Sequence, residues 1–231
     1  MNTTLSQKEL SKYVIMQLET FFPDGHRFSN DLFCKGVETA LFRCEECFKH
    51  ILIPGYCDKN GPVFSHLHMD QYASFLYFLS NTLYMEYGIE AKIICDKIIN
   101  LNRLLNGFFL SYKCPMPEIF ILAHPVGSVI GNANYSDGLY ISQNVTINTH
   151  TDDKGNIDLN IGKGFFCGAG AKIIGNKNIG DRVSVGVNTL IYNKKIVSDS
   201  VCCMNDEGNL VIRERESSKC MAARVFDIDF N

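Results

Sequence analysis

A six-residue repeat runs through the second half of the chain, from residue 123 to residue 197. Apolar or aromatic residues recur at every sixth position, with one interruption between Ile147 and Ile161. This period fits neither the 3.6-residue turn of a helix nor the strict alternation of a β-strand. It is typical of a parallel β-helix, in which each short strand turns one apolar side chain into a shared core. The residues expected in that inner column are Ala123, Val129, Tyr135, Ile141, Ile147, Ile161, Cys167, Ile173, Ile179, Val185, Ile191 and Val197.

The first half of the chain has the apolar periodicity of helices. Ser6 and Glu9 have the spacing of a capping box, which marks the start of the first helix. Pro and Gly residues then divide the helical segments from one another. We expect four helices: one between Ser6 and Pro23, one from Ser29 or Asn30 to Pro54, one from near His68 or Asp70 to Gly88, and one over Ile89–Leu110.

These patterns predict an α+β protein in three parts. Residues 1–116 form an N-terminal helical domain, residues 117–204 a parallel β-helix of hexapeptide repeats, and residues 205–231 a C-terminal tail. Within the tail, residues 205–219 are charged, so we expect them to be exposed. Residues 221–230 are apolar enough to pack back onto the protein.

The composition leaves small-molecule chemistry open. The 231 residues carry a formal net charge of -3, which argues against nucleic-acid binding through a broad basic surface. The first ten residues lack the apolar segment of a secretory signal, and the uncharged stretch 71–85 is too short to span a membrane. We therefore expect a cytoplasmic protein with neither a membrane nor a nucleic-acid partner.

Ten cysteines are present, and Cys44 and Cys47 form a CxxC motif with Cys34 and Cys57 outside it. A tetrahedral zinc site needs four ligands, and this motif supplies two. Cys44 and Cys47 also fall on the apolar face of a predicted helix. We expect buried free thiols and no metal site.

Two histidines are candidates for a catalytic base, because imidazole transfers protons near neutral pH. His124 lies at the start of the repeat, in the segment Ala123-His124-Pro125-Val126-Gly127. His150 lies in the polar insert 148–160 that interrupts the repeat, and loops that leave a rigid scaffold often carry function. A surface histidine without any role is the alternative for each.

Residues from about Asp70 to Val197 resemble the serine acetyltransferases of the hexapeptide acyltransferase superfamily. Three segments carry the resemblance, and they occur in the family's order. They are Asp70-Gln71-Tyr72-Ala73-Ser74-Phe75-Leu76, then His124-Pro125-Val126-Gly127 with the coil after it, and Gly168-Ala169-Gly170-Ala171-Lys172-Ile173-Ile174-Gly175-Asn176.

This resemblance implies a helical domain followed by a left-handed parallel β-helix, and an acetyl-CoA-dependent O-acetyltransferase. His124 corresponds to the general base, which the family position favours over His150. The acetyl donor, acetyl-CoA, would contact Thr149, Gly168, Ala169, Gly186 and Val187, with Lys194 or Lys195 near a phosphate. Asp70, His150 and Asp158 would contact a small hydroxyl acceptor such as L-serine. Members of the family form homotrimers or dimers of trimers, with the site between subunits.

The chain departs from the family pattern around the acceptor. Ala123 stands where the family has an Asp directly before its catalytic His, and no Asp matches the one that orients the His ring. Glu118 is the carboxylate nearest in the sequence that could take this role. Ile157-Asp158 replaces an Arg-His pair that holds the carboxylate of serine, and an anion there disfavours such an acceptor. A sugar or surface-polysaccharide precursor therefore competes with L-serine. An N-acetyltransferase acting on an amino sugar and a non-catalytic β-helix scaffold remain as alternatives.

Overall fold

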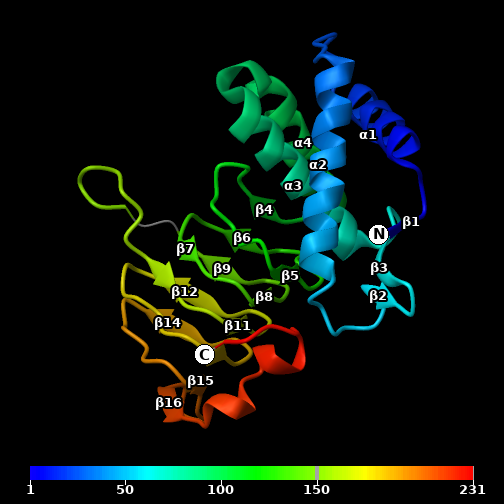
Figure 1. Cartoon of the computed structure of the whole chain (residues 1–231). Helices are drawn as coiled ribbons and strands as arrows, with labels where there is room; N and C mark the ends of the chain where they lie inside the picture. Colours follow the sequence, from blue (N-terminus) through cyan, green and yellow to red (C-terminus); the bar gives the residue numbers. More distant parts are fainter. Residues whose placement is uncertain (149–150, 231) are drawn as a thin grey trace.

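The computed structural model describes residues 1–148 and 151–230. Helices from the first half of the chain gather beside one end of a coil of short strands, and the C-terminal segment packs at the other end of the coil (Figure 1). Among the described residues, no helix combines the length and the apolar character needed to cross a membrane.

The helical part consists of α1 (Gln7–Phe21), α2 (Asn30–Phe48), α3 (Met69–Tyr87), a 3₁₀ turn (Gly88–Ala91) and α4 (Lys92–Asn106). The predicted capping box is confirmed, because the Ser6 hydroxyl accepts from the Glu9 N–H and the Glu9 side chain accepts from the Ser6 N–H. A small sheet of β1 (Asn2–Thr3), β3 (Gly61–Phe64) and β2 (Cys57–Asp58) lies beside these helices.

The fourth helix is shorter than the sequence predicted. It ends at Asn106, because Gly107 adopts a left-handed conformation with φ of 65° and caps the helix. Phe109 and Leu110, expected at the helix end, instead form β4 (Phe109–Leu110). This strand pairs in parallel with β6 (Val129–Ile130), so it already belongs to the coil.

The coil is a parallel β-helix built from three stacks of strands. The first stack runs β4, β6, β9 (Thr146–Ile147), β12 (Lys172–Ile174) and β14 (Leu190–Tyr192). The second runs β5 (Phe120–Leu122), β8 (Leu139–Ile141), β11 (Phe166–Cys167), β13 (Ser184–Val185) and β15 (Ser200–Met204), all parallel. β7 (Asn134–Tyr135) and β10 (Asn160–Ile161) form the third, which single bridges extend through Ile179 to Ile196.

The predicted inner column is confirmed in the middle of the coil and wrong at two positions. Ile141, Ile147, Ile161, Cys167, Ile173, Ile179, Val185 and Ile191 are all buried. Val129 and Val197 are exposed, and Ile130 and Ile196 take the inner positions. Val129 pairs with Thr146 seventeen residues later, whereas Lys172 pairs with Leu190 eighteen residues later. A change of one residue turns a side chain to the other face of its strand.

The C-terminal tail is held to the coil. Part of the charged segment 205–219, which was expected to be exposed, forms β16 (Leu210–Glu214), which pairs antiparallel with β15 and is half-buried over its first three residues. Phe226 and Phe230 are buried, as expected for residues 221–230. Figure 1 shows this segment, in red, lying against the strands of the coil.

The α2 helix contacts the coil through one of the predicted buried thiols. Cys44 and Cys47 are fully buried and free, as the sequence predicted. The Cys47 thiol donates to the carbonyl oxygen of Phe120 in β5 at 3.3 Å. Burial raises the pKa of Cys47 to about 12, so this thiol stays protonated and serves packing.

Candidate active site

His124 lies on a corner of the coil that is longer than the corners below it. The chain takes seven residues to pass from Leu122 to Val129, but five from Ile141 to Thr146, the paired positions one coil later. The two extra residues let His124 stand out from the corner. Its backbone is left-handed, with φ of 49°, and its side chain is 82% exposed.

The strand register places His124 at the head of a corner that the following coils continue. Leu122 pairs with Ile141, Ile141 with Cys167, and Cys167 with Val185. Gln143, Ala169 and Val187 hold equivalent positions on successive coils, because the Gly170 and Asn188 N–H groups donate to the Gln143 and Ala169 carbonyls. On the coil before them Val126 holds this position, and His124 and Pro125 are the two extra residues that precede it. One position after the strands come Ala123, Ser142, Gly168 and Gly186. Four of the sequence-predicted site residues thus share the corner headed by His124.

Small residues are required along this corner because the coils approach closely. A Cβ atom on Gly168 would lie 2.9 Å from the carbonyl oxygen of Val185. The Gly168 and Gly186 N–H groups donate to the carbonyls of Val185 and Cys202. Within the described residues, the N–H groups of Ala169 and Val187 have no acceptor. They are available to a molecule lying along the corner.

Asp70 lies beside His124, although the two residues come from different parts of the fold. Asp70 is in the first turn of α3, where the helix dipole favours a negative charge. Its Oδ2 atom is 3.1 Å from Nδ1 of His124, and its side chain is 10% exposed. The Nε2 atom of the same imidazole has no protein partner within the described residues. An imidazole oriented in this way can exchange a proton through Nε2.

Two tyrosines that the sequence did not single out complete the surroundings of Asp70. Burial and, to a smaller extent, the charge of Asp70 raise the pKa of Tyr56 above its usual range. Burial and the same charge also raise the pKa of Tyr140, against a hydrogen bond with Ser142 that lowers it. Tyr140 lies on β8 and stacks on Phe166 of β11, with ring centroids 4.4 Å apart. Nothing in the spacing of the sequence marks these tyrosines, because their closeness to Asp70 depends on how α3 docks on the coil.

The remaining predicted residues lie apart from His124 or outside the described part of the chain. Glu118 receives two contacts from the guanidinium of Arg43, so its carboxylate is engaged elsewhere. Asp158 precedes β10 in the third stack and accepts a hydrogen bond from Asn176 at 3.4 Å. Lys194 and Lys195 are exposed after β14. Thr149 and His150 lie outside the described residues.

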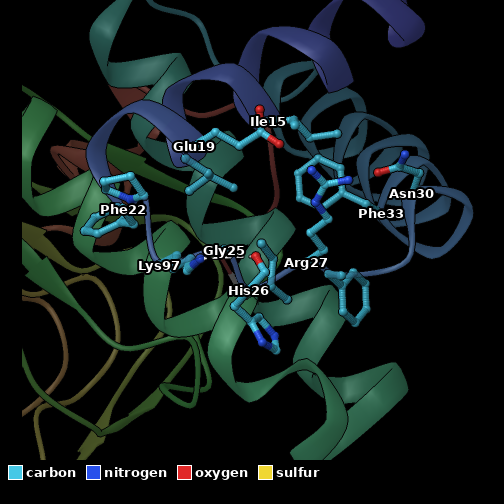
Figure 2. Close-up of a pocket in the computed structure, with 13 residues that line it drawn as sticks. Ile15, Glu19, Phe22, Gly25, His26, Arg27, Asn30, Phe33 and Lys97 are labelled. Carbon is cyan, nitrogen blue, oxygen red and sulfur yellow. Dashed lines mark hydrogen bonds between the residues drawn. The ribbon is translucent and has the colours of Figure 1, made fainter.

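A cavity of about 370 Å³ lies in the helical part, away from these residues. Figure 2 shows it bounded by the end of α1, the connection to α2, and Lys97 of α4, and Ile94 of α4 also lines it. The buried Lys97 ammonium lies 2.5 Å from Asp24 Oδ1 and so fixes this connection. None of the sequence-predicted site residues lines the cavity.

Comparison with known proteins gives one family. No protein-family model matches the chain. Over 106 residues the chain is 26% identical to a serine acetyltransferase of Staphylococcus aureus (strain Mu50 / ATCC 700699) and 30% identical to one of Staphylococcus epidermidis. Each match covers 46% of this chain and 50% of the relative, so the chain spans about half the length of the curated relatives it matches.

Solved structures agree with this similarity over more of the chain. Serine acetyltransferase from Brucella abortus strain S19 superposes with a TM-score of 0.63 at 17% identity, covering 91% of this chain and 84% of that one. The enzyme from Vibrio cholerae O1 superposes with a TM-score of 0.60 at 20% identity, covering 95% and 76%. At these identities the superpositions establish a shared fold. The sequence similarity to the two Staphylococcus enzymes confirms the resemblance found in the sequence.

Proposed function

The chain is a relative of the serine acetyltransferases, and from this relationship we propose that it is an acetyl-CoA-dependent O-acetyltransferase of the same type. Its acceptor is L-serine or a similar small molecule with a hydroxyl group, and His124 is the general base. The observation that carries the proposal is the His124 imidazole: Nδ1 lies 3.1 Å from a carboxylate, while Nε2 is open on an exposed corner.

The proposed reaction needs a base because a hydroxyl is a poor nucleophile at neutral pH. Nε2 of His124 takes the proton of the acceptor hydroxyl as its oxygen attacks the thioester carbonyl. The new C–O bond forms, the C–S bond breaks, and Nε2 returns the proton to the departing thiolate. The products are an acetyl ester and a free thiol, and His124 ends in its starting state.

The corner below His124 is suited to hold the acetyl donor, which supplies the acetyl group as a thioester. The N–H groups of Ala169 and Val187, which have no acceptor among residues 1–148 and 151–230, can donate to carbonyl oxygens placed along the corner. The lack of side chains at Gly168 and Gly186 keeps the wall narrow. We assign these four residues, together with Thr149 outside the described residues, to donor binding.

The acceptor side is assigned to Asp158 and His150, and acetylation assays test it. Purified protein is given acetyl-CoA with L-serine, L-alanine, nucleotide sugars or an amino sugar, and free thiol is measured while products are identified by mass spectrometry. We expect thiol release with L-serine and none with L-alanine, which lacks the hydroxyl. A sugar ester as the product would keep the chemistry and change the acceptor. An amide product would replace O-acetylation by N-acetylation, and a folded protein without release on any acceptor would be a scaffold.

We also propose a homotrimer or a dimer of trimers, a left-handed coil, a cytoplasmic location, and the three parts 1–116, 117–204 and 205–231. Exposed apolar side chains on the first stack support assembly: Phe109 on β4, Val129 on β6 and Leu190 on β14 are 38%, 45% and 43% exposed. Thr146 and Lys172 lie between Val129 and Leu190 in the same column of the stack. Exposed apolar side chains gathered on one face are typical of a surface that packs against another copy. Light scattering after size-exclusion chromatography should give three or six chains per particle. A monomer would contradict the assembly.

A further inference from the structure

The closest charged neighbour of the His124 imidazole comes from the helical part of the chain. Asp70 Oδ2 lies 3.1 Å from His124 Nδ1, and the Asp70 side chain is nearly buried while that of His124 is exposed. An exposed imidazole on a loop corner is free to rotate unless a second group fixes it. Asp70 is placed to do so, because it belongs to the first turn of α3, which packs against β5 just before His124.

The other groups around Asp70 do not compete for its charge. Tyr56 and Tyr140 have raised pKa values, for which burial is the main cause, so both are neutral near pH 7. Within the described residues, no lysine or arginine forms an ion pair with Asp70. Glu118 is held by Arg43, and this removes the carboxylate that the sequence offered as a partner for His124.

We propose that Asp70 is the positioning residue of His124. Its carboxylate holds the proton on Nδ1, which leaves Nε2 as the atom that accepts the acceptor's proton, and it stabilises the imidazolium that then forms. A carboxylate that orients a histidine in this way sets both the tautomer and the ring direction. The inference rests on the proposed function for its kinetic consequences, and it replaces the acceptor contact inferred for Asp70 from sequence resemblance.

The two roles of Asp70 differ in what they predict for kinetics. If Asp70 positions His124, Asp70→Asn lowers kcat by about 10²-fold or more, because the amide can donate to Nδ1 and fix the proton on Nε2. KM for the acceptor then changes little. If Asp70 only binds the acceptor, the same substitution raises KM and leaves kcat near its original value. Asp31→Asn is the matched control, since Asp31 is the acidic residue in the first turn of α2 and is exposed.

A second measurement separates this inference from the proposed function. In ¹⁵N NMR spectra of the neutral imidazole, assigned with His124→Ala, we expect the proton on Nδ1 in the unaltered protein and a shift toward Nε2 in Asp70→Asn. Thermal unfolding verifies that both variants are folded. An unchanged tautomer in Asp70→Asn would overturn the positioning role even if the protein acetylates no tested acceptor. Loss of catalysis in His124→Ala combined with full kcat in Asp70→Asn would overturn it as well.

Discussion

Arg43 of α2 joins the helical part to the β-helix through a bidentate ion pair with Glu118, which lies just before β5. Its Nε lies 3.2 Å from Oε2 and its Nη2 lies 3.0 Å from Oε1. The same guanidinium donates to Asn81 and Thr82 of α3 and lies 4.4 Å from the ring centroid of Phe78. Arg43 thus connects α2, α3 and the start of the coil.

This contact predicts unequal effects for its two partners. Arg43→Ala should lower the free energy of unfolding by about 1–3 kcal/mol, because it removes the donor to Asn81 Oδ1 and to the Thr82 hydroxyl oxygen and uncovers Phe78. Glu118→Gln should cost less than about 1 kcal/mol, because this carboxylate is 61% exposed. Urea unfolding of both variants measures the difference. Equal losses would mean that the ion pair, rather than the links to α3, dominates.

The last coil offers a test of which side chain fills the core. Ile196 is 1% exposed and Val197 is 57% exposed, opposite to the expectation from the repeat. Ile196→Ala should lower the free energy of unfolding by about 2–4 kcal/mol through the cavity it leaves. Val197→Ala should change it by less than about 0.5 kcal/mol. Chemical denaturation measures both losses. A larger loss for Val197→Ala than for Ile196→Ala would mean that Val197 fills the core, as the sequence predicted.

Alanine substitutions at Gly170 and Gly25 can separate the stability cost of a strained backbone from the cost of steric crowding. Both have left-handed backbones, with φ of 72° and 74°. A Cβ on Gly170 would lie 2.1 Å from Asn188 Oδ1, whereas nothing lies within 4 Å of one on Gly25. Gly25→Ala should cost about 1–2 kcal/mol from conformation alone. Gly170→Ala should cost more, because the side chain of Asn188 must also move, and thermal unfolding should rank the two variants in this order.

The ion pair of Arg182 and Asp199 predicts a pH dependence of stability. A hydrogen bond from Arg182, whose Nε lies 2.7 Å from Oδ1, is the main cause that lowers the pKa of Asp199. A carboxyl group with a lowered pKa in the folded state stabilises the protein above its unfolded pKa of about 3.9, and this stabilisation is lost as pH falls further. Asp199→Asn should therefore cost about 1 kcal/mol at pH 7, since the pair is partly exposed.

The same substitution should have a shrinking effect in acid. The difference in unfolding free energy between the unaltered protein and Asp199→Asn should narrow as pH drops below about 4. Asp181→Asn on the preceding coil serves as a control. A difference that stays constant down to pH 3 would show that packing, rather than charge, accounts for the effect.

The repeat made the coil predictable because each inner position is specified locally by one apolar side chain in a short strand. The exceptions at Val129 and Val197 arise where a coil departs from eighteen residues, and a fixed period of six cannot register such a departure. The end of α4 was misplaced for a related reason. Phe109 and Leu110 continue the apolar pattern of the helix, but the left-handed Gly107 ends it and β6 is available as a partner.

The sequence was enough to predict which residues of the candidate site lie along the corner. It was not enough to predict which side chain contacts His124. Ala169 and Val187 share a register that follows directly from the repeat, and His124 lies in the two-residue insertion at the head of the same corner. The approach of Asp70 to His124 joins residues fifty-four positions apart and depends on how α3 docks on β5. Proximity in the sequence therefore favoured Glu118 as the carboxylate partner of His124, whereas in the structure Glu118 forms an ion pair with Arg43.

The central claim is that His124 supplies the base for acetyl transfer, and initial rates of thiol release from acetyl-CoA test it most directly. The unaltered protein, His124→Ala and His150→Ala are compared at saturating acceptor, each with its folded state verified. The account predicts a rate lowered by about 10²-fold or more in His124→Ala and a rate of the original order in His150→Ala. A full rate in His124→Ala, with the loss falling on His150→Ala instead, would contradict it.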